Sequence, residues 1–415
     1  MKVGGRLGRT FESFGNYNFR LFWIGQLVSQ IGTWMQMVAL PWLVLELTHS
    51  PAALGTVTAL QYVPILIVVL FAGVVVDRFP KQRLLLVTQS ASLAQALTLA
   101  VLTASGHIQV WELYLLAVVL GLTNAFDSPA RQAFVTELVG RDNVVNAVGL
   151  SSAQFSSARL VGPAIGGLVI ARWGIPACFY LNAVSFLAVL VSLLFLRPGQ
   201  FHAAPRGPAG VPVVRQLREG ISFLLSKREL TVATIVLAGN GAFIYSTSSI
   251  IPLIAQYELN VGPEQLGLLV AAVGLGSLVM ALTIASHGRS SQRILLTAAA
   301  LFGLFYLSLA FAPSFAVGFV LLALVGGSIQ VFGTSVNSLM QMGSPDHLRG
   351  RVMAVFTLLT NGITPLGSLF TGFVTASAGI RFTLAGEAAI CFMALALALG
   401  YRARAQAAPA VQGAG

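Results

Sequence analysis

The fold is decided by residues 54–83, which read LGTVTALQYVPILIVVLFAGVVVDRFPKQR. The run Leu54–Val76 contains no charged residue, and a helix needs about 20 apolar residues to cross the hydrocarbon core of a bilayer. Basic residues follow this run directly, as is typical where a helix leaves a membrane on the cytoplasmic side. The stretch therefore predicts a transmembrane helix followed by a short basic loop.

The whole chain has a similar composition. Of its 415 residues, 56% are hydrophobic and only 9% are charged, whereas soluble domains have about 25% charged residues. So few charges cannot cover a surface that faces water, and we expect lipid to surround much of the chain. Twelve apolar runs are long enough to span a membrane, which predicts an all-α integral membrane protein. The runs are Leu21–Leu45, Leu54–Val76, Leu84–Ala104, Leu113–Phe134, Val144–Ile170, Cys178–Leu196, Leu230–Gln256, Leu266–Ser286, Ile294–Ala312, Phe315–Met340, Val352–Ala376 and Phe382–Tyr401.

The distribution of Lys and Arg orients these spans. If the N-terminus lies in the cytoplasm, 21 of the 24 basic residues fall on the cytoplasmic side, while Arg172 and Arg381 fall outside and Arg159 lies within a span. This pattern obeys the positive-inside rule, and it explains the net charge of +11 without nucleic acid because these residues meet anionic headgroups. We expect a multi-pass protein of the cell (inner) membrane with both termini in the cytoplasm.

The chain divides at its longest polar stretch, Arg197–Arg228, which carries four prolines. The expected parts are an N-terminal six-helix bundle at 1–196, a cytoplasmic linker at 197–229, a C-terminal six-helix bundle at 230–402 and a flexible tail at 403–415. Within the linker, the pattern of Val213–Ser226 predicts an amphipathic surface helix.

The two halves carry matching loops. Residues 46–55, ELTHSPAALG, align with residues 258–267, ELNVGPEQLG, and residues 82–86, QRLLL, align with residues 292–296, QRILL. A third match joins Gly162-Pro163 to Pro365 and Gly367 in the same topological order. We infer a duplicated six-span unit, and two such repeats around a midplane site are typical of transporters that work by alternating access.

Residues 73–83, GVVVDRFPKQR, resemble the loop signature of the major facilitator superfamily, with Pro80 where that family usually has Gly. The resemblance implies twelve helices in two pseudo-symmetric six-helix bundles. It also implies that Gly73, Asp77, Arg78, Lys81 and Arg83 form a gating loop that latches the cytoplasmic ends of the two halves. The alternative is that these charges only set the orientation of the spans. The mirror loop has His287 where Asp77 aligns, so a second latch is not expected.

A second resemblance points to export. Gly149, Gly162, Pro163, Gly166 and Gly167 resemble the antiporter motif of exporters in this superfamily, although Ala158 replaces a family glycine. The motif implies close packing of the fifth span on its repeat partner, with Pro163 bending the helix; ordinary glycine-mediated packing is the alternative. The fourth-span Arg of many drug–proton antiporters is missing, since Ala117 stands there. Residues 127–134 and 158–163 resemble the transmembrane secretion effector branch, which includes enterobactin exporters and macrolide efflux proteins.

Charged residues inside the spans are candidate site residues because they are costly in lipid. Arg159 either attracts an anionic substrate or forms a structural ion pair. Asp127 and Arg131 lie four residues apart, so they share a helical face if the helix continues, whereas Ser128-Pro129 would start a new helix if it breaks. Asp127 is the best candidate for a proton-linked carboxylate, with a structural salt bridge as its alternative, and we expect Glu387 to be structural.

The cavity in this superfamily is lined by the first, fourth, seventh and tenth helices. Polar side chains on these helices are expected to face it, although some will only bond neighbouring helices. The candidates on the first helix are Gln30, Trp34 and Met37, which lie three or four residues apart and share a face. The other candidates are Asn240, Tyr245 and Asn337, which are polar positions in apolar runs.

Several chemistries are excluded by missing motifs. The sequence has no Gly-rich phosphate loop, no HExxH and no Gly-x-Ser-x-Gly, and its histidines and two cysteines are too scattered to bind a metal. We therefore expect that the chain is not an enzyme, that it binds no cofactor or metal, and that it does not use ATP directly. The sequence favours a monomeric, proton-driven exporter of small amphipathic molecules, siderophore-like or drug-like. The alternatives are an importer of a small metabolite and a sensor or assembly protein that does not transport.

Overall fold

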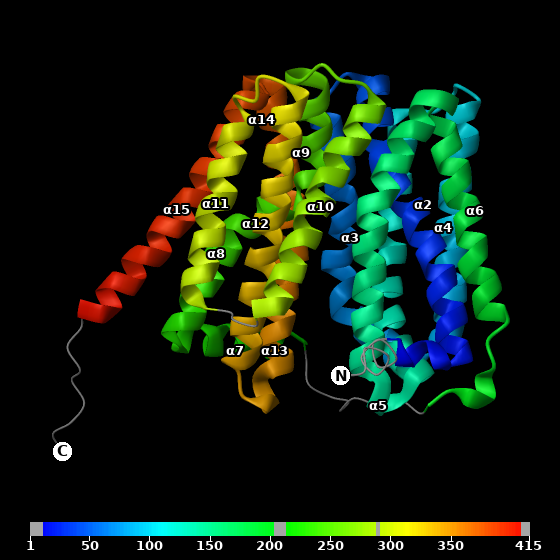
Figure 1. Ribbon diagram of the computed structural model, residues 1–415, viewed down its shortest axis with the longest axis horizontal. Coiled ribbons are helices and arrows are strands. Elements are labelled where there is room, and N and C mark those ends of the chain that lie inside the picture. Colours follow the sequence, from blue (N-terminus) through cyan, green and yellow to red (C-terminus); the bar gives the residue numbers. More distant parts are fainter. Residues whose placement is uncertain (1–10, 203–212, 288–290, 408–415) are drawn as a thin grey trace, which may run out of the picture. The chain divides into compact units, whose positions relative to one another are not determined.

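The computed structural model describes residues 11–202, 213–287 and 291–407 (Figure 1). Within these ranges, the side chains at 69–74, 77, 213–214, 245, 285–287, 346 and 405–407 lie outside the description. The described chain is helical, and its internal contacts divide it into two units. The first comprises Met1–Ala209 with Val261–Ala271, and the second comprises Gly210–Asn260 with Ala272–Gly415.

The first unit is built from five helices with two short 3₁₀ turns. They are α2 (Tyr17–Thr48), α3 (Pro51–Arg78), α4 (Lys81–Ala104), α5 (Val110–Trp173) and α6 (Ile175–Leu194), with η1 (Glu12–Gly15) before them and η2 (Pro198–Gln200) after them. Helix α2 packs on both α5 and α6, and α3 packs on α5. Asn16 and Ser50 cap α2 and α3 by accepting backbone N–H groups of the first helical turn.

The second unit has a more broken set of helices. They are α7 (Val213–Ser226), α8 (Arg228–Tyr245), α9 (Thr247–Leu253), η3 (Ile254–Glu258), α10 (Pro263–His287), α11 (Gln292–Leu309), α12 (Phe315–Met342), α13 (Asp346–Thr357), η4 (Leu358–Gly362), α14 (Thr364–Ala378) and α15 (Ile380–Ala407). The first turns of α10 are grouped with the first unit. Helix α7 has the bounds that the amphipathic pattern predicts, which confirms that the linker contains a helix.

The number of spans differs from a simple count of twelve. In the described chain, ten helices are long and apolar enough to cross a membrane, or eleven if the bent pair around Ser246 is one span. One of these helices is α5, whose 64 residues run through the fourth and fifth predicted spans. The rise of about 1.5 Å per residue makes α5 far longer than a bilayer is thick, so its two arms account for two crossings.

Gly140 is the point at which α5 bends. Its φ of +73° is a conformation that residues with a Cβ rarely adopt, so glycine is needed there. Of the two interpretations of Ser128-Pro129, the start of a new helix is wrong, because α5 continues through both residues. The His202 ring lies against Gly140, and the His202 backbone N–H donates to the Glu137 carbonyl over 2.8 Å. The start of the linker is therefore fixed to the bend.

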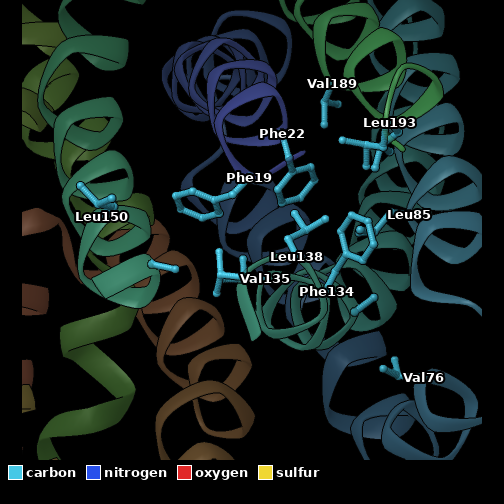
Figure 2. Packing of buried hydrophobic residues seen from close by; sticks show 14 residues of the cluster. Phe19, Phe22, Val76, Leu85, Phe134, Val135, Leu138, Leu150, Val189 and Leu193 are labelled. Carbon is cyan, nitrogen blue, oxygen red and sulfur yellow. The ribbon is translucent and has the colours of Figure 1, made fainter. Parts of the chain in front are cut away.

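A buried apolar cluster of the first unit joins α2, α3, α4, α5 and α6 (Figure 2). Figure 2 shows Phe19 and Phe22 of α2 pointing toward Val135, Leu138 and Phe134 of α5. The rings of Phe22 and Phe134 meet edge to face, with their centroids 5.3 Å apart. In a bilayer such packing stabilises by dispersion rather than by release of water, so close geometry matters more than area. The cluster holds together the helices that carry the polar groups described next.

Candidate functional site

Asp127 is the centre of a buried polar cluster inside the first unit. One of its carboxylate oxygens accepts hydrogen bonds from the Thr88 hydroxyl (2.9 Å) and the Gln89 amide (2.7 Å), both on α4. The other oxygen lies 3.5 Å from the Arg131 guanidinium, one turn later in α5. Arg131 in turn donates to the amide oxygen of Gln26 on α2 over 3.3 Å. The cluster therefore links three helices through one carboxylate and one guanidinium, and it places the predicted Asp127–Arg131 pair on a single helical face.

One atom in each of two side-chain amides of this cluster lacks a protein partner among the described residues. Among the side chains that the structure describes, the nitrogen of Gln26 and the oxygen of Gln89 accept or donate no hydrogen bond, although both residues are at least 96% buried. Buried polar groups are nearly always satisfied, so a water molecule or a ligand is the expected partner of these two atoms. The sequence patterns named neither residue, although Gln26 stands one helical turn before the candidate Gln30.

Arg159 lies in a second, aromatic cluster of the same unit. Its guanidinium carbon is 5.7 Å from the centroid of the Trp34 ring on α2, within the range of a cation–π contact. The Trp34 ring meets Phe155 of α5 edge to face at 5.6 Å. Gln30 and Met37, predicted to share the face of Trp34, are half-buried. The structure thus brings Arg159 and Trp34 together, with Phe155 as a neighbour that the sequence patterns missed.

The glycines of the predicted antiporter motif mark close contacts between α5 and α2. A Cβ atom added at Gly162 would lie 2.5 Å from the Trp34 Cβ, and one added at Gly166 would lie 3.0 Å from the Met35 Cα. Gly167 lies against the backbone of Pro263, in the segment of α10 grouped with the first unit. The partner that the structure shows for Gly162 and Gly166 is α2, whereas the sequence motif implied the repeat partner of the fifth span.

Gly149, the first residue of the motif, is different from the other glycines. No heavy atom lies within 4 Å of a Cβ added there, and the residue is exposed. Pro163, beside Gly162, is buried within α5. The need for a small residue is therefore greatest at positions 162 and 167, smaller at 166 and lowest at 149.

The predicted gating loop joins α3 to α4. Lys81 lies 3.4 Å from the Glu137 carboxylate of α5, an acidic partner that the loop signature did not identify. Arg78 and Arg83 are exposed, while the surroundings of Gly73 and the side chain of Asp77 fall outside the described part of the structure. The loop is fixed further by Gln82, whose amide donates to the Leu193 carbonyl of α6 over 2.7 Å.

The candidates of the second unit are mainly bonded within their own helices. Asn240 is fully buried in α8 and donates to the Val236 carbonyl, while its side-chain oxygen has no partner among the described residues. The Asn337 oxygen of α12 accepts from Gln341 over 2.7 Å. The Tyr245 side chain lies outside the described residues.

Arg381 and Glu387 have partners in the second unit that the sequence did not predict. Arg381, one of the arginines outside the positive-inside pattern, forms a two-pronged ion pair with Glu258 of η3, at 2.7–3.1 Å. Glu387 of α15 is fully buried and accepts a hydrogen bond from the Thr371 hydroxyl of α14. No cluster of three His, Cys, Asp or Glu side chains that could hold a metal occurs among the described residues.

Several known proteins are similar to this chain over nearly its full length. The multidrug efflux pump Tap of Mycobacterium tuberculosis (strain ATCC 25618 / H37Rv) is 31% identical over 89% of this chain and 88% of its own. The staphyloferrin A transporter of Staphylococcus aureus is 25% identical over 90% and 94%. A solved structure, that of a bacterial homologue of the human lysosomal transporter Spinster, superposes with a TM-score of 0.72 over 93% of this chain and 96% of that one; at 14% identity this shows the fold alone. The family model described as transmembrane secretion effector matches residues 9–413, so the chain belongs to this family of the major facilitator superfamily.

Proposed function

We propose that this chain is a secondary active exporter of small amphipathic molecules, driven by the proton gradient and working by alternating access. Membership of the secretion effector family supports the proposal, as do relatives that are named as a multidrug efflux pump and a staphyloferrin A transporter. The observation that carries it is the buried Asp127 cluster, because it offers a carboxylate whose partners depend on its charge.

The coupling step assigned to Asp127 is a change of partner. As a carboxylate, it holds Arg131 and accepts from two neutral donors on α4. Proton uptake removes the charge that faces Arg131, so the guanidinium is then held mainly by Gln26 of α2. A group whose protonation changes the contacts among three helices biases two conformations of the unit. The competing role is a salt bridge that only fixes the packing of α5.

The substrate-binding surface assigned to the first unit is the Arg159 cluster. A guanidinium over an indole, flanked by a phenyl ring, offers flat apolar area together with one positive charge. Such a surface suits neutral or anionic amphipathic cargo, siderophore-like or drug-like, better than a dye of high positive charge. Further substrate contacts are proposed at the remaining polar candidates, Gln30, Met37, Asn240, Tyr245 and Asn337.

The orientation and the gate are proposed from the basic residues. Both termini lie in the cytoplasm of the cell (inner) membrane, since this placement puts most Lys and Arg on one side. The loop with Gly73, Asp77, Arg78, Lys81 and Arg83 then closes the cytoplasmic ends, with Lys81 anchored on Glu137. The chain acts as a monomer and uses protons rather than ATP.

The test is uptake into everted membrane vesicles energised to form a proton gradient. A catecholate siderophore, a macrolide and a cationic dye form the panel, and the expected result is gradient-dependent accumulation of the siderophore or the macrolide. Asp127→Asn abolishes the dependence on the gradient, whereas Asp142→Asn, an exposed position of the same helix, leaves it intact.

Three results would count against the proposal. Accumulation in right-side-out vesicles alone indicates an importer, and no movement of any compound by well-inserted protein indicates a role without transport. Full gradient dependence in correctly folded Asp127→Asn assigns Asp127 to structure only.

A further inference from the structure

Helix α7 has three distinct faces, which follow from the helical spacing of its residues and differ in what they contact. Gly220 and Leu224 form the first face, and they pack against the rest of the second unit. A Cβ added at Gly220 would lie 2.6 Å from the Arg351 carbonyl oxygen of α13, and Leu224 is fully buried. The Thr231 hydroxyl of α8 donates to the Leu224 carbonyl over 3.1 Å. Figure 1 shows α7 beside α13, at the end of α8 where that helix begins.

The second face of α7 is apolar yet exposed. Ile221 and Leu225, four residues apart on one side of the helix, are 42% and 54% exposed. Both side chains are far more exposed than Leu224, which the described part of the second unit buries completely. Because α8 starts at Arg228, these side chains lie close to the point at which the chain passes between a bilayer and water. An exposed apolar strip at that depth matches the boundary of the acyl chains.

The third face is basic and borders a pocket. Arg215, Arg218, Ser222 and Ser226 follow one another at spacings of three or four residues, so they share a side of α7. With Arg351 and Leu348 of α13, and with Glu219 and Phe223, they line an open cavity of about 680 Å³. Glu219 pairs with Arg215 at 2.9 Å and also with Arg351. Two guanidinium groups thus pair with one carboxylate, and Arg218 adds a third positive charge to the lining, which leaves the pocket with an excess of positive charge.

We propose that the pocket between α7 and α13 binds the phosphate headgroup of an anionic phospholipid. The guanidinium groups and the serine hydroxyls are donors that match phosphate oxygens, and Arg prefers paired contacts with such groups. The apolar strip of Ile221 and Leu225 lies next to the basic face on the helix, where the acyl chains of the same lipid would continue. Basic pockets at the cytoplasmic ends of spanning helices are favourable places for such headgroups. The lipid thereby ties α7 to the bilayer, independently of what the chain transports.

The experiment uses the purified full-length protein in detergent, titrated with dioleoyl phosphatidylglycerol and, separately, with dioleoyl phosphatidylcholine. Native mass spectrometry measures the bound lipid. We expect selective binding of phosphatidylglycerol, weakened about fivefold for each arginine removed in Arg215→Gln and Arg218→Gln. Arg218→Lys retains most of the affinity because the charge remains. Arg141→Gln and Arg172→Gln, at exposed positions of the first unit, leave binding unchanged.

A second pair of variants keeps every arginine. Ser222→Glu places a negative charge in the pocket from an exposed position, whereas Ser105→Glu places one in an exposed loop of the first unit. The proposal requires Ser222→Glu alone to lose the lipid. It is overturned if both serine variants bind equally well, if the Arg141 and Arg172 variants lose as much affinity as the α7 variants, or if inorganic phosphate at the same concentration displaces the lipid completely.

Discussion

The guanidinium of Arg131 lies 3.5 Å from the carboxylate of Asp127, with side-chain exposures of 29% and 7%. Because the acid is nearly buried, its carboxylate is surrounded by Arg131 and two neutral donors rather than by water. Removal of one partner from a buried pair typically costs about 3–5 kcal/mol, since the other charge stays in a medium of low dielectric constant. The partial exposure of Arg131 reduces that cost because solvent screens the pair.

We therefore expect Arg131→Gln to lower the free energy of unfolding by about 1–3 kcal/mol. In the double variant Asp127→Asn/Arg131→Gln no charge is left unpaired, so most of the loss should be recovered. Thermal unfolding in detergent measures both, and vesicle uptake measures transport, which the double variant should not regain. A double variant as unstable as Arg131→Gln would mean that the pair contributes by shape rather than by charge.

Gly162 should tolerate no side chain, because an added Cβ would lie 2.5 Å from the Trp34 Cβ and 2.9 Å from the Ile31 carbonyl oxygen. We expect Gly162→Ala to cost about 1–3 kcal/mol through overpacking and to slow transport by separating α5 from α2. Gly149→Ala is the matched control in the same helix, where an added Cβ meets nothing within 4 Å. There the change should stabilise by about 0.5–1 kcal/mol, because alanine favours a helix. Equal behaviour of the two variants in thermal unfolding would refute this packing argument.

Gln36 joins α2 to two other helices through its side-chain amide. It donates to the Gln95 oxygen of α4 over 3.2 Å and accepts from Asn182 of α6 over 2.7 Å. Replacement by Leu removes both contacts, yet hydrogen bonds between membrane helices are worth only about 0.6 kcal/mol on average. We expect Gln36→Leu to cost about 1 kcal/mol and Gln36→Glu to cost more. A double-mutant cycle with Asn182→Ala, followed by thermal unfolding, gives the coupling, and a value near zero would show that the network is dispensable.

The sequence was sufficient for the features that depend on composition and spacing. The apolar runs predicted a membrane protein, the motif residues predicted the superfamily and its secretion effector branch, and Val213–Ser226 predicted α7. These signals are strong because lipid forces whole segments to be apolar, and because amphipathic spacing repeats over several turns. The bend at Gly140 gave no such signal, since a glycine among many is distinguished only by its φ angle.

The spacing of residues could not predict which side chains from distant parts of the sequence pair with one another. Lys81 pairs with Glu137, and Arg381 pairs with Glu258, each through a tertiary contact. Thr88, Gln89 and Gln26 contact the Asp127–Arg131 pair from neighbouring helices for the same reason. The pair of Asp127 and Arg131, by contrast, followed from the period of the helix itself, because the two residues lie four apart in α5.

Glu387 of α15 should be structural rather than part of the transport site. It is fully buried, and one of its oxygens accepts from the Thr371 hydroxyl of α14, so it holds two helices of the second unit together. Glutamine keeps a carbonyl oxygen for that hydroxyl and nearly the same volume, whereas alanine leaves both a cavity and an unpaired hydroxyl. We expect Glu387→Gln to unfold within about 1 kcal/mol of the wild type and to transport normally, and Glu387→Ala to lose about 2–5 kcal/mol. Thermal unfolding and vesicle uptake, measured on the same preparations, separate the two roles. If Glu387→Gln folds normally but loses gradient-driven uptake, Glu387 takes part in proton coupling, and Asp127 is no longer sufficient to explain it.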